Sequence, residues 1–227
     1  TYYAPNNASI IVAGDIDERR TLELIREHYC GMPAAEIPKE RRVTEPKQRR
    51  ERRLTLPQPT DTEKLEIGWR GPAWGDPDYA TLTVLNEVFS GGRSSRLYRS
   101  LVSDGELATI ASASPTPFEQ PGLYELWADA REGVTAKDLL KVVDREIAKI
   151  KKNGVTAAEL EKAKNRLELG FVSAMETASG KAEQLGFVTT VANDTGAIFR
   201  RLDAFRHPDM PVLRQREQAH GRFGDRA

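Results

Sequence analysis

Two strand-like runs follow one another near the middle of the chain, at residues 108–114 and 123–130. A short proline-containing stretch separates them. In the second run Tyr124, Leu126 and Ala128 alternate with the residues of the opposite face, which is the two-residue period of a strand with one buried side. Strands joined so closely pair in antiparallel fashion, because a parallel pair needs a long crossover. The sequence therefore predicts a fold built on antiparallel strand pairs.

The rest of the chain repeats this pairing and adds helices. Further strands are predicted at 8–14, 53–57 and 64–72. Helices are predicted at 15–29, 76–89, 94–103, 135–152, 156–185 and 197–205, the first capped by Asp15 or Asp17 and the fifth weakened at Gly180. Residues 34–53, rich in charge and proline, are predicted to be an exposed connector. This order predicts an α+β fold, with a mostly antiparallel sheet and helices packed on one face.

The chain is predicted to hold one α+β domain, residues 1–206, followed by a polar tail at 207–227 that is atypical or disordered. The first seven residues contain no Met, no charged leader and no apolar leader segment. We therefore expect the chain to be an excised piece of a longer protein. No apolar run approaches the roughly 20 residues that a membrane span needs.

The charge balance gives no sign of an anionic partner. The 34 basic and 34 acidic residues cancel. The one dense basic cluster lies at residues 49–53 and has no interleaved aromatic residues, so nucleic-acid binding is not expected. On the fifth helix, Glu159, Glu161, Lys162, Lys164 and Glu168 have the spacing of solvent-exposed pairs within one helix.

The histidines cannot form a catalytic zinc site. Such a site takes three protein ligands, and His28, His207 and His220 are too far apart for any two to share a helix face. Residues 24–28 resemble the inverted H-x-x-E-H signature, but Leu24 occupies the first ligand position. We therefore expect no metal ligand and no catalytic residue in this chain, and we interpret Glu27 and His28 as an ordinary polar helix end.

Two other patterns suggest chemistry more weakly. Cys30 beside His28 lacks an orienting third residue, and a plain half-buried cysteine is the simpler interpretation. The loop Gly91, Gly92, Arg93, Ser94, Ser95 and Arg96 combines glycines, hydroxyls and arginines, as phosphate cradles do. It lacks the G-x-x-x-x-G-K-[ST] pattern, so a helix break with Ser94 or Ser95 as N-cap is favoured.

Three stretches together resemble the pitrilysin/insulinase family of zinc metallopeptidases, which includes mitochondrial processing peptidase. They are residues 2–15, residues 91–98 with the Leu101 and Leu107-Ala108 positions that follow, and residues 156–165. Their order and spacing match the non-catalytic domain that follows the zinc-binding domain in that family, over about residues 1–206. The atypical tail departs from the family, whose domains usually continue with another helix.

The resemblance implies how the parent protein works. It implies that zinc is bound by the preceding domain, that this chain itself holds no cofactor, and that the two enclose a peptide substrate with a second half. That half carries an Arg and a Tyr seven residues apart, and the corresponding positions here are Val102 and Thr109. The resemblance also implies that the loop at 91–96 lines the chamber. The bacterial periplasm is favoured over the cytoplasm, because many bacterial relatives are exported.

Three hypotheses follow for function. The leading one is a non-catalytic, substrate-enclosing domain of a zinc metallopeptidase that degrades or processes peptides. The alternative is a stand-alone interaction or scaffold protein of the same fold without peptidase activity. The third, an independent enzyme that uses Cys30 or the loop at Gly91, has almost no support in the sequence.

Overall fold

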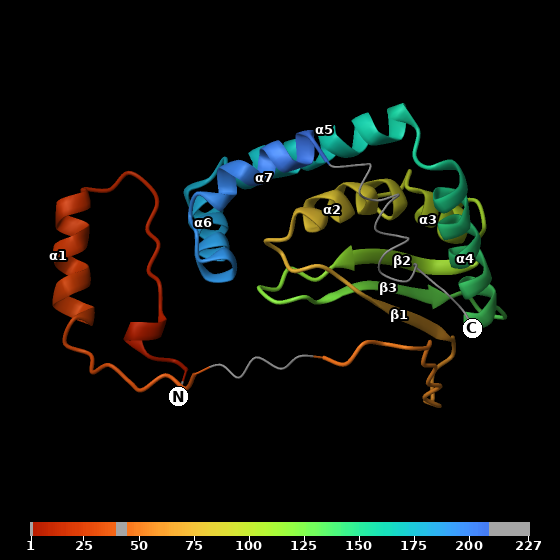
Figure 1. The fold of residues 1–227 in the computed structure, drawn as a ribbon, viewed down its shortest axis with the longest axis horizontal. Coiled ribbons are helices and arrows are strands. Elements are labelled where there is room, and N and C mark those ends of the chain that lie inside the picture. The colour runs from red at the N-terminus through yellow and green to blue at the C-terminus, as the bar shows by residue number, and fades with distance from the viewer. Residues whose placement is uncertain (1, 40–44, 209–227) are drawn as a thin grey trace.

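The structure is a computed structural model that describes residues 2–39 and 45–208 (Figure 1). A single turn of 3-10 helix at Pro5–Asn7 precedes the regular elements. These are α1 (Glu18–Tyr29), β1 (Lys64–Arg70), α2 (Pro77–Phe89), α3 (Arg96–Tyr98), a π-helical turn (Arg99–Ser103), β2 (Ala108–Pro115), β3 (Leu123–Ala130), α4 (Ala136–Asn153), α5 (Ala157–Ala174), α6 (Ala178–Ala192) and α7 (Ala197–Arg206). Helices combined with one antiparallel sheet confirm the predicted α+β class.

The sheet has three strands in the order β1-β3-β2, and β3 pairs antiparallel with both neighbours. The β2–β3 pair is the hairpin predicted from residues 108–130. Its register places Ala113 opposite Leu126, and the register shifts between Ala108 and Ile110. On the other side of β3, Trp69 of β1 lies opposite Tyr124, and their rings are 5.9 Å apart. The sheet is therefore organised around the strand with the clearest alternation.

The main core fills the space between the sheet and the helices. Leu126 and Ala128 of β3 are fully buried, and they belong to one cluster with Leu97 and with Leu139 and Val143 of α4. Leu82 and Phe89 of α2 are part of the same cluster. The hydroxyl of the buried Tyr124 donates a hydrogen bond to Asn86 Oδ1 at 2.8 Å, so the one polar atom of this ring is satisfied.

Two smaller clusters attach α5, α6 and α7 to α2. Trp74 and Tyr79 pack with Val188 of α6 and Ile198 of α7, whereas Phe205 of α7 packs with Val84 and Val88 of α2. The guanidinium of Arg201 lies over both the Trp74 ring and the Phe205 ring, at 5.4 and 5.3 Å. These clusters complete a folded body, residues 64–208, and every member of all three clusters lies within it.

The predicted single helix at 156–185 is wrong, because α5 ends at Ala174 and α6 starts at Ala178. Thr177 caps α6, with its hydroxyl accepting a hydrogen bond from the Gly180 amide at 3.0 Å. Gly180 marks the corner for a steric reason, since a Cβ at this position would lie 2.0 Å from the Ala174 carbonyl oxygen. The sequence therefore pointed to the right residue but placed the break a few residues too late.

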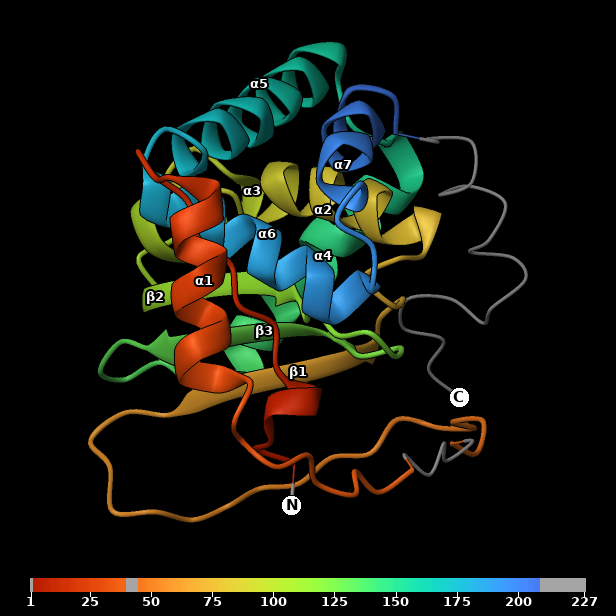
Figure 2. The same cartoon turned by 90° about the vertical axis from the view of Figure 1, so that its left-hand side faces the viewer.

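The predicted strands at 8–14 and 53–57 are also wrong, since neither segment has strand structure. Strand structure requires a paired backbone, and the part of the chain that the structure describes supplies these runs with no neighbouring strand. The first run lies extended between α1 and α6 (Figures 1 and 2). The second belongs to an exposed extended segment that leads into β1.

None of the helices within the described ranges is long and apolar enough to cross a membrane. The predicted polar tail lies outside the described residues from position 209 onward. His207 and Pro208, its first two residues, directly follow α7.

Candidate functional site

The loop at 91–96 joins α2 to α3 and rests on the start of α5. Gly92 has a φ of +78°, a conformation that favours glycine. Ser95 is buried, and its hydroxyl accepts a hydrogen bond from the Tyr98 amide at 3.4 Å. The predicted N-cap is therefore confirmed at Ser95.

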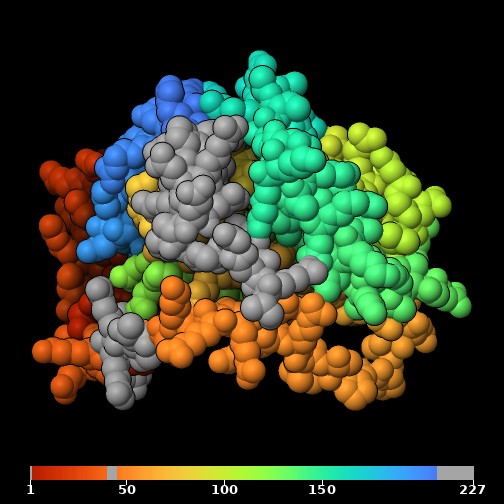
Figure 3. Space-filling view, turned by 45° about the vertical axis from the view of Figure 1, so that its right-hand side comes forward, coloured from red at the N-terminus to blue at the C-terminus, as the bar shows by residue number. Residues whose placement is uncertain are grey.

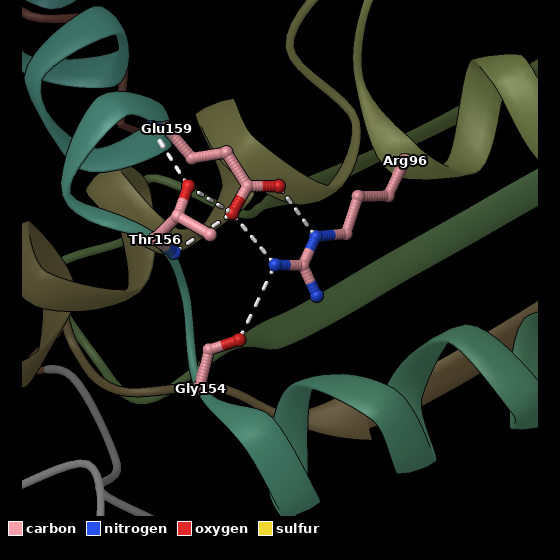
Figure 4. Close-up of polar contacts among 4 residues, drawn as sticks. All are labelled: Arg96, Gly154, Thr156 and Glu159. Atoms are coloured by element: carbon pink, nitrogen blue, oxygen red, sulfur yellow. Dashed lines mark hydrogen bonds and ion pairs between the residues drawn. The ribbon is translucent and has the colours of Figure 1, made fainter.

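Arg96 and Glu159 make the strongest contact between the loop and α5 (Figure 4). The guanidinium donates two hydrogen bonds to the two oxygens of the carboxylate, each at 2.7 Å, and a third to the Gly154 carbonyl at 3.2 Å. The same carboxylate accepts from the Thr156 amide at 2.8 Å, as one half of a capping box. A bidentate pair of this kind fixes both the distance and the relative orientation of the loop and α5.

The hydrogen bonds to Glu159 change its acidity. Those from the Arg96 guanidinium, with smaller contributions from Thr156, lower the pKa of the Glu159 carboxyl to about 2. The same pair raises the pKa of Arg96, mainly through its hydrogen bond to Glu159. Both groups are therefore charged over the ordinary pH range, and neither is suited to exchange protons with a substrate.

Two further side chains of α5 hold the loop. Lys162 bonds the hydroxyl of Ser94, and Arg166 donates to the Glu87 carboxylate at the end of α2, at 2.9 Å. Glu168 bonds Arg206 of α7. The predicted pairing within α5 is therefore wrong for Glu159, Lys162 and Glu168, because each contacts a partner on another part of the chain.

The hollow enclosed between the loop and α5 is too small for a phosphate group. A hollow between the loop and α5 has a volume of about 20 Å³ and is lined by Glu87, Val88, Ser94, Ser95, Glu159, Lys162, Ala163 and Arg166. This is room for about one water molecule. A larger, open groove of about 400 Å³ runs along one face of α5 and is lined by Ala158, Glu161, Lys162, Asn165, Arg166 and Leu169. The loop therefore presents a surface, and the phosphate-cradle interpretation does not fit it.

The two positions predicted to lack the substrate-holding pair lie on different elements. Val102 is in the π-helical turn and packs partly buried against the main core. Thr109 is exposed at the register shift of β2, and its hydroxyl donates to the Asp129 carbonyl at 3.3 Å. Both side chains are bonded or packed within the domain.

The described residues assemble no set of donors for a metal ion. Within residues 2–39 and 45–208, no three His, Cys, Asp or Glu side chains are grouped so that they could hold an ion. His28 and Cys30 are both exposed at the end of α1, and Cys30 is therefore not the half-buried residue that was predicted. The described part of the chain therefore does not fit a zinc site.

A second surface of interest is residues 8–32, which we call the N-terminal arm. The arm contains α1, which is capped at Asp17, whose carboxylate accepts from the Arg20 amide at 2.8 Å. No residue of α1 is buried. Between 43% and 50% of the surface of each large apolar side chain in the following set is exposed: Ile10, Val12, Ile16, Leu22, Tyr29 and Met32. An amphipathic helix beside an apolar extended segment normally packs its apolar face against another apolar surface.

The arm touches the body along α6 only lightly. A Cβ placed on Gly186 would lie 3.6 Å from Ile11 Cδ1, and one placed on Gly14 would lie 4.0 Å from Ala178 Cβ. At the base of the arm, the Asn6 side chain donates to the Ala35 carbonyl and accepts from the Ala35 amide, each at 3.0 Å. Figure 2 shows α1 standing outside α6, with its outer side open.

The family sequence model described as "Peptidase M16 inactive domain" matches residues 1–167, which include the arm and the loop. The chain belongs to the peptidase M16 inactive-domain family. It is 29% identical over 185 residues to the zinc protease PqqE of Helicobacter pylori, covering 80% of this chain and 41% of that protein. It is 24% identical over 202 residues to the mitochondrial-processing peptidase subunit beta of Lentinula edodes, covering 82% and 42%. The resemblance found in the sequence is thereby confirmed.

The fold of this M16 inactive domain agrees with a solved structure. A protease from Helicobacter pylori superposes with a TM-score of 0.85 at 24% identity, over 96% of this chain and 54% of that one. The chain thus spans about two fifths of the length of the curated relatives that it matches. The family description as inactive is consistent with the absence of catalytic activity predicted for this chain.

Sequence reasoning found the loop of this M16 domain but missed what holds it. Lys162 and Arg166 were missed because their partners, Ser94 and Glu87, lie 68 and 79 residues away. The capping box formed by Thr156 and Glu159 is a local signal, and it could have drawn attention to Glu159 as an anchoring residue.

Proposed function

We propose that this chain is a non-catalytic domain of a zinc-dependent metallopeptidase that degrades or processes peptides. In this proposal it supports the zinc-bearing domain and forms part of the wall that encloses the peptide. The family match and the two-fifths coverage of zinc-protease relatives support this role. The parent's peptidase activity resides in the preceding domain, which supplies the zinc ligands.

The observation that carries the proposal is the open apolar surface of the arm. Leu22 and Tyr29 of α1 are each 49% exposed, and Ile10 and Val12 are exposed to a similar degree. Burying the exposed half of four such side chains would contribute roughly 3–5 kcal/mol. That is enough to stabilise a domain interface when both domains belong to one chain.

The arm also offers main-chain groups to a partner. Residues 9–13 are extended, and their main-chain groups make no hydrogen bond to any other part of the described chain. An extended segment of this kind adds readily to the edge of another sheet. We propose that the zinc-bearing domain supplies that sheet edge. In this proposal α1 packs against the same domain, beside the added segment.

The loop at 91–96 is proposed to line the substrate chamber. Three contacts with α5 hold its main chain in one conformation. They are made by Arg96 and Ser94 of the loop and by Glu87, which lies at the end of α2 just before the loop. Arg93 is exposed at its tip and would face the peptide. The proposed arrangement has helices on one face of the sheet, which leaves the face bearing Trp127 for contacts in the assembled enzyme.

The proposal requires a further partner for activity. Because Val102 and Thr109 replace the Arg and Tyr that the resemblance implies, a second half must bring that pair to the peptide. This half can be part of the same chain or a separate protein. We also propose a periplasmic location, from the resemblance alone.

The test is to reconstitute the enzyme from its parts. The chain is mixed with the separately expressed zinc-bearing domain of its parent, and binding is measured by calorimetry and cleavage with a quenched peptide library. Wild-type chain should bind and increase the domain's activity. The double variant Leu22→Asp with Ile25→Asp should weaken binding at least about tenfold, because it places charge in the apolar contact.

Arg20→Glu is the matched control. It changes the charge of α1 by the same two units, on the opposite side of the helix, and should leave binding within about twofold. Equal binding by the Leu22/Ile25 double variant would overturn the proposed contact. Binding without any gain in cleavage, even with an Arg/Tyr-bearing half added, would favour the interaction or scaffold protein over the peptidase domain.

A further inference from the structure

Residues 45–61, which lie between the arm and β1 and are called the connector from here on, form a long exposed stretch. Every residue from 45 to 61 is exposed, and none is in a helix or strand. Leu54 is 80% exposed and Leu56 is 67% exposed, so even the apolar side chains of the connector do not pack on the body. Figure 3 shows this segment, in orange, along the lower border of the molecule.

The connector is tied to the body at its two ends. At one end, the guanidinium of Arg70 donates to the Pro46 carbonyl at 2.6 Å and pairs with Glu45 at 3.3 Å. At the other end, the Glu63 carboxylate accepts from the Ala136 amide at 2.7 Å. Between these anchors, the side-chain hydrogen bonds of Gln48, Arg53 and Thr60 are made within the segment itself. A break in the middle would therefore leave both ends attached.

Two pairs of adjacent arginines lie in the middle of this stretch, Arg49-Arg50 and Arg52-Arg53. Endopeptidases of trypsin-like specificity bind an arginine side chain in an anionic pocket. They hold the substrate as an extended strand, and exposed segments without secondary structure are where such cleavage concentrates. The Arg53–Glu51 ion pair, at 2.5 Å, would not protect the site, because both side chains are well exposed and such pairs contribute little.

The same chemical motif occurs elsewhere in a different backbone context. The other adjacent basic pairs of the described chain are Arg19-Arg20 in α1, Lys151-Lys152 in α4 and Arg200-Arg201 in α7. Each must unwind before a protease can bind it, whereas no residue from 45 to 61 is in a helix or strand that would have to unfold first. Backbone context therefore singles out the connector from four regions with similar side chains.

We infer that the connector is a processing site for an endopeptidase that cleaves after paired arginines. Water adds to the carbonyl of Arg50 or Arg53, and the peptide bond to Glu51 or Leu54 breaks. The products are an arginine carboxylate and a new α-amine on the following residue. No oxidant, metal or further reactant is needed beyond the protease and water.

Cleavage there separates two regions with different fates. All three apolar clusters lie within residues 65–205, so the body keeps its core intact. The N-terminal fragment, which contains the arm, keeps its light contact with α6 and the contacts of Glu45 and Pro46 with Arg70. This inference goes beyond the proposed function and does not depend on it, because it rests on the connector alone.

Limited proteolysis of the full chain tests the inference. The chain is treated with a low ratio of trypsin and, separately, with an endopeptidase that requires paired basic residues. Early products are identified by mass spectrometry. The first cut by both enzymes should follow Arg50 or Arg53, at least about tenfold faster than any cut in α1, α4 or α7. The body fragment should still unfold cooperatively on heating.

Two variants make the result specific. Replacing all four arginines (R49Q/R50Q/R52Q/R53Q) should abolish the early cut, whereas R19Q/R20Q should leave its rate unchanged. A first cut outside residues 49–53, including one after Arg93 in the exposed loop, would overturn the inference. So would cleavage of the body fragment's core at the same rate as the connector.

Discussion

The body and the N-terminal arm use similar side chains in different ways. Leu126 of β3 has no exposed surface, whereas Leu22 of α1 has half of its surface exposed, although both lie on the apolar face of a regular pattern. In the body, the apolar faces that form the three clusters have a second element of the same chain opposite them. In the arm, the patterns are as clear, but residues 45–208 supply only the contact with α6, which leaves about half of the surface of Leu22 and Tyr29 exposed. Pattern alone therefore specifies that a surface will be buried, and says nothing about which molecule buries it.

The largest effect on stability is expected from truncating a buried side chain of the central strand, β3. Leu126→Ala leaves a cavity among α2, α4 and the sheet, and should lower the free energy of unfolding by about 3 kcal/mol. Leu54→Ala, in the exposed connector, is the control and should change it by less than about 0.5 kcal/mol. Denaturant unfolding followed by circular dichroism measures both. Equal effects would show that the body has no dominant core.

The contact between the loop and α5 should have a smaller effect. Arg96→Ala leaves Glu159 partly buried without its guanidinium, and should cost about 1–2 kcal/mol of stability. Arg99→Ala removes an ion pair in which both side chains are more than half exposed, and should cost less than about 0.5 kcal/mol. Thermal unfolding distinguishes the two. If Arg99→Ala proves the more damaging, the loop is not held in the way described.

The same contact should respond to acid. The folded-state pKa of Glu159 is lowered to about 2 from an ordinary value of 4.5, so its contribution is fully present above pH 4.5. It is lost as the pH falls from 4.5 toward 2. Allowing for solvent screening, the loss should be about 1 kcal/mol. The stability of Glu159→Gln should therefore fall less steeply between pH 5 and 2, and parallel curves would contradict this.

The smallest effect is expected in the arm of the isolated chain. Leu22→Asp should change the free energy of unfolding by less than about 0.5 kcal/mol, because this leucine contributes nothing to the three apolar clusters. Chemical denaturation of the purified variant measures it, with Leu126→Ala as the reference for a buried leucine. A loss of several kcal/mol would show that the arm is part of the body's cooperative unit.

Local pattern predicted the elements whose partners are close in sequence. The β2–β3 hairpin was found because Tyr124, Leu126 and Ala128 alternate, and the helix predicted at 135–152 agrees with α4 to within one residue at each end. The run at residues 8–14 has the same strand signal, yet forms no strand here, since pairing depends on a neighbour that the local sequence cannot reveal.

The position of the loop was predicted correctly, whereas the contacts that Lys162 and Arg166 of α5 make with it and with the end of α2 were not. Glycines and a capping serine are local signals, and they located residues 91–96 correctly. The partners of Ser94 and Glu87 come from α5, and contacts across nearly 70 residues or more depend on how the helices pack. The corner between α5 and α6 was also missed. The local sequence allows either one long helix or a new helix capped by Thr177, and the structure has the second.

The Asn6–Ala35 bonds have a consequence for how docking of the arm could be observed. Closing a chain segment of this length costs about 3 kcal/mol in chain entropy, and two exposed hydrogen bonds return about 1 kcal/mol each. The Asn6–Ala35 contact is thus only marginally stable by itself, and it becomes more stable when a partner holds α1 in place. Exchange of the Ala35 amide hydrogen with solvent should therefore slow when a partner covers the arm, although Ala35 itself touches no partner. This single amide would act as a remote reporter of assembly.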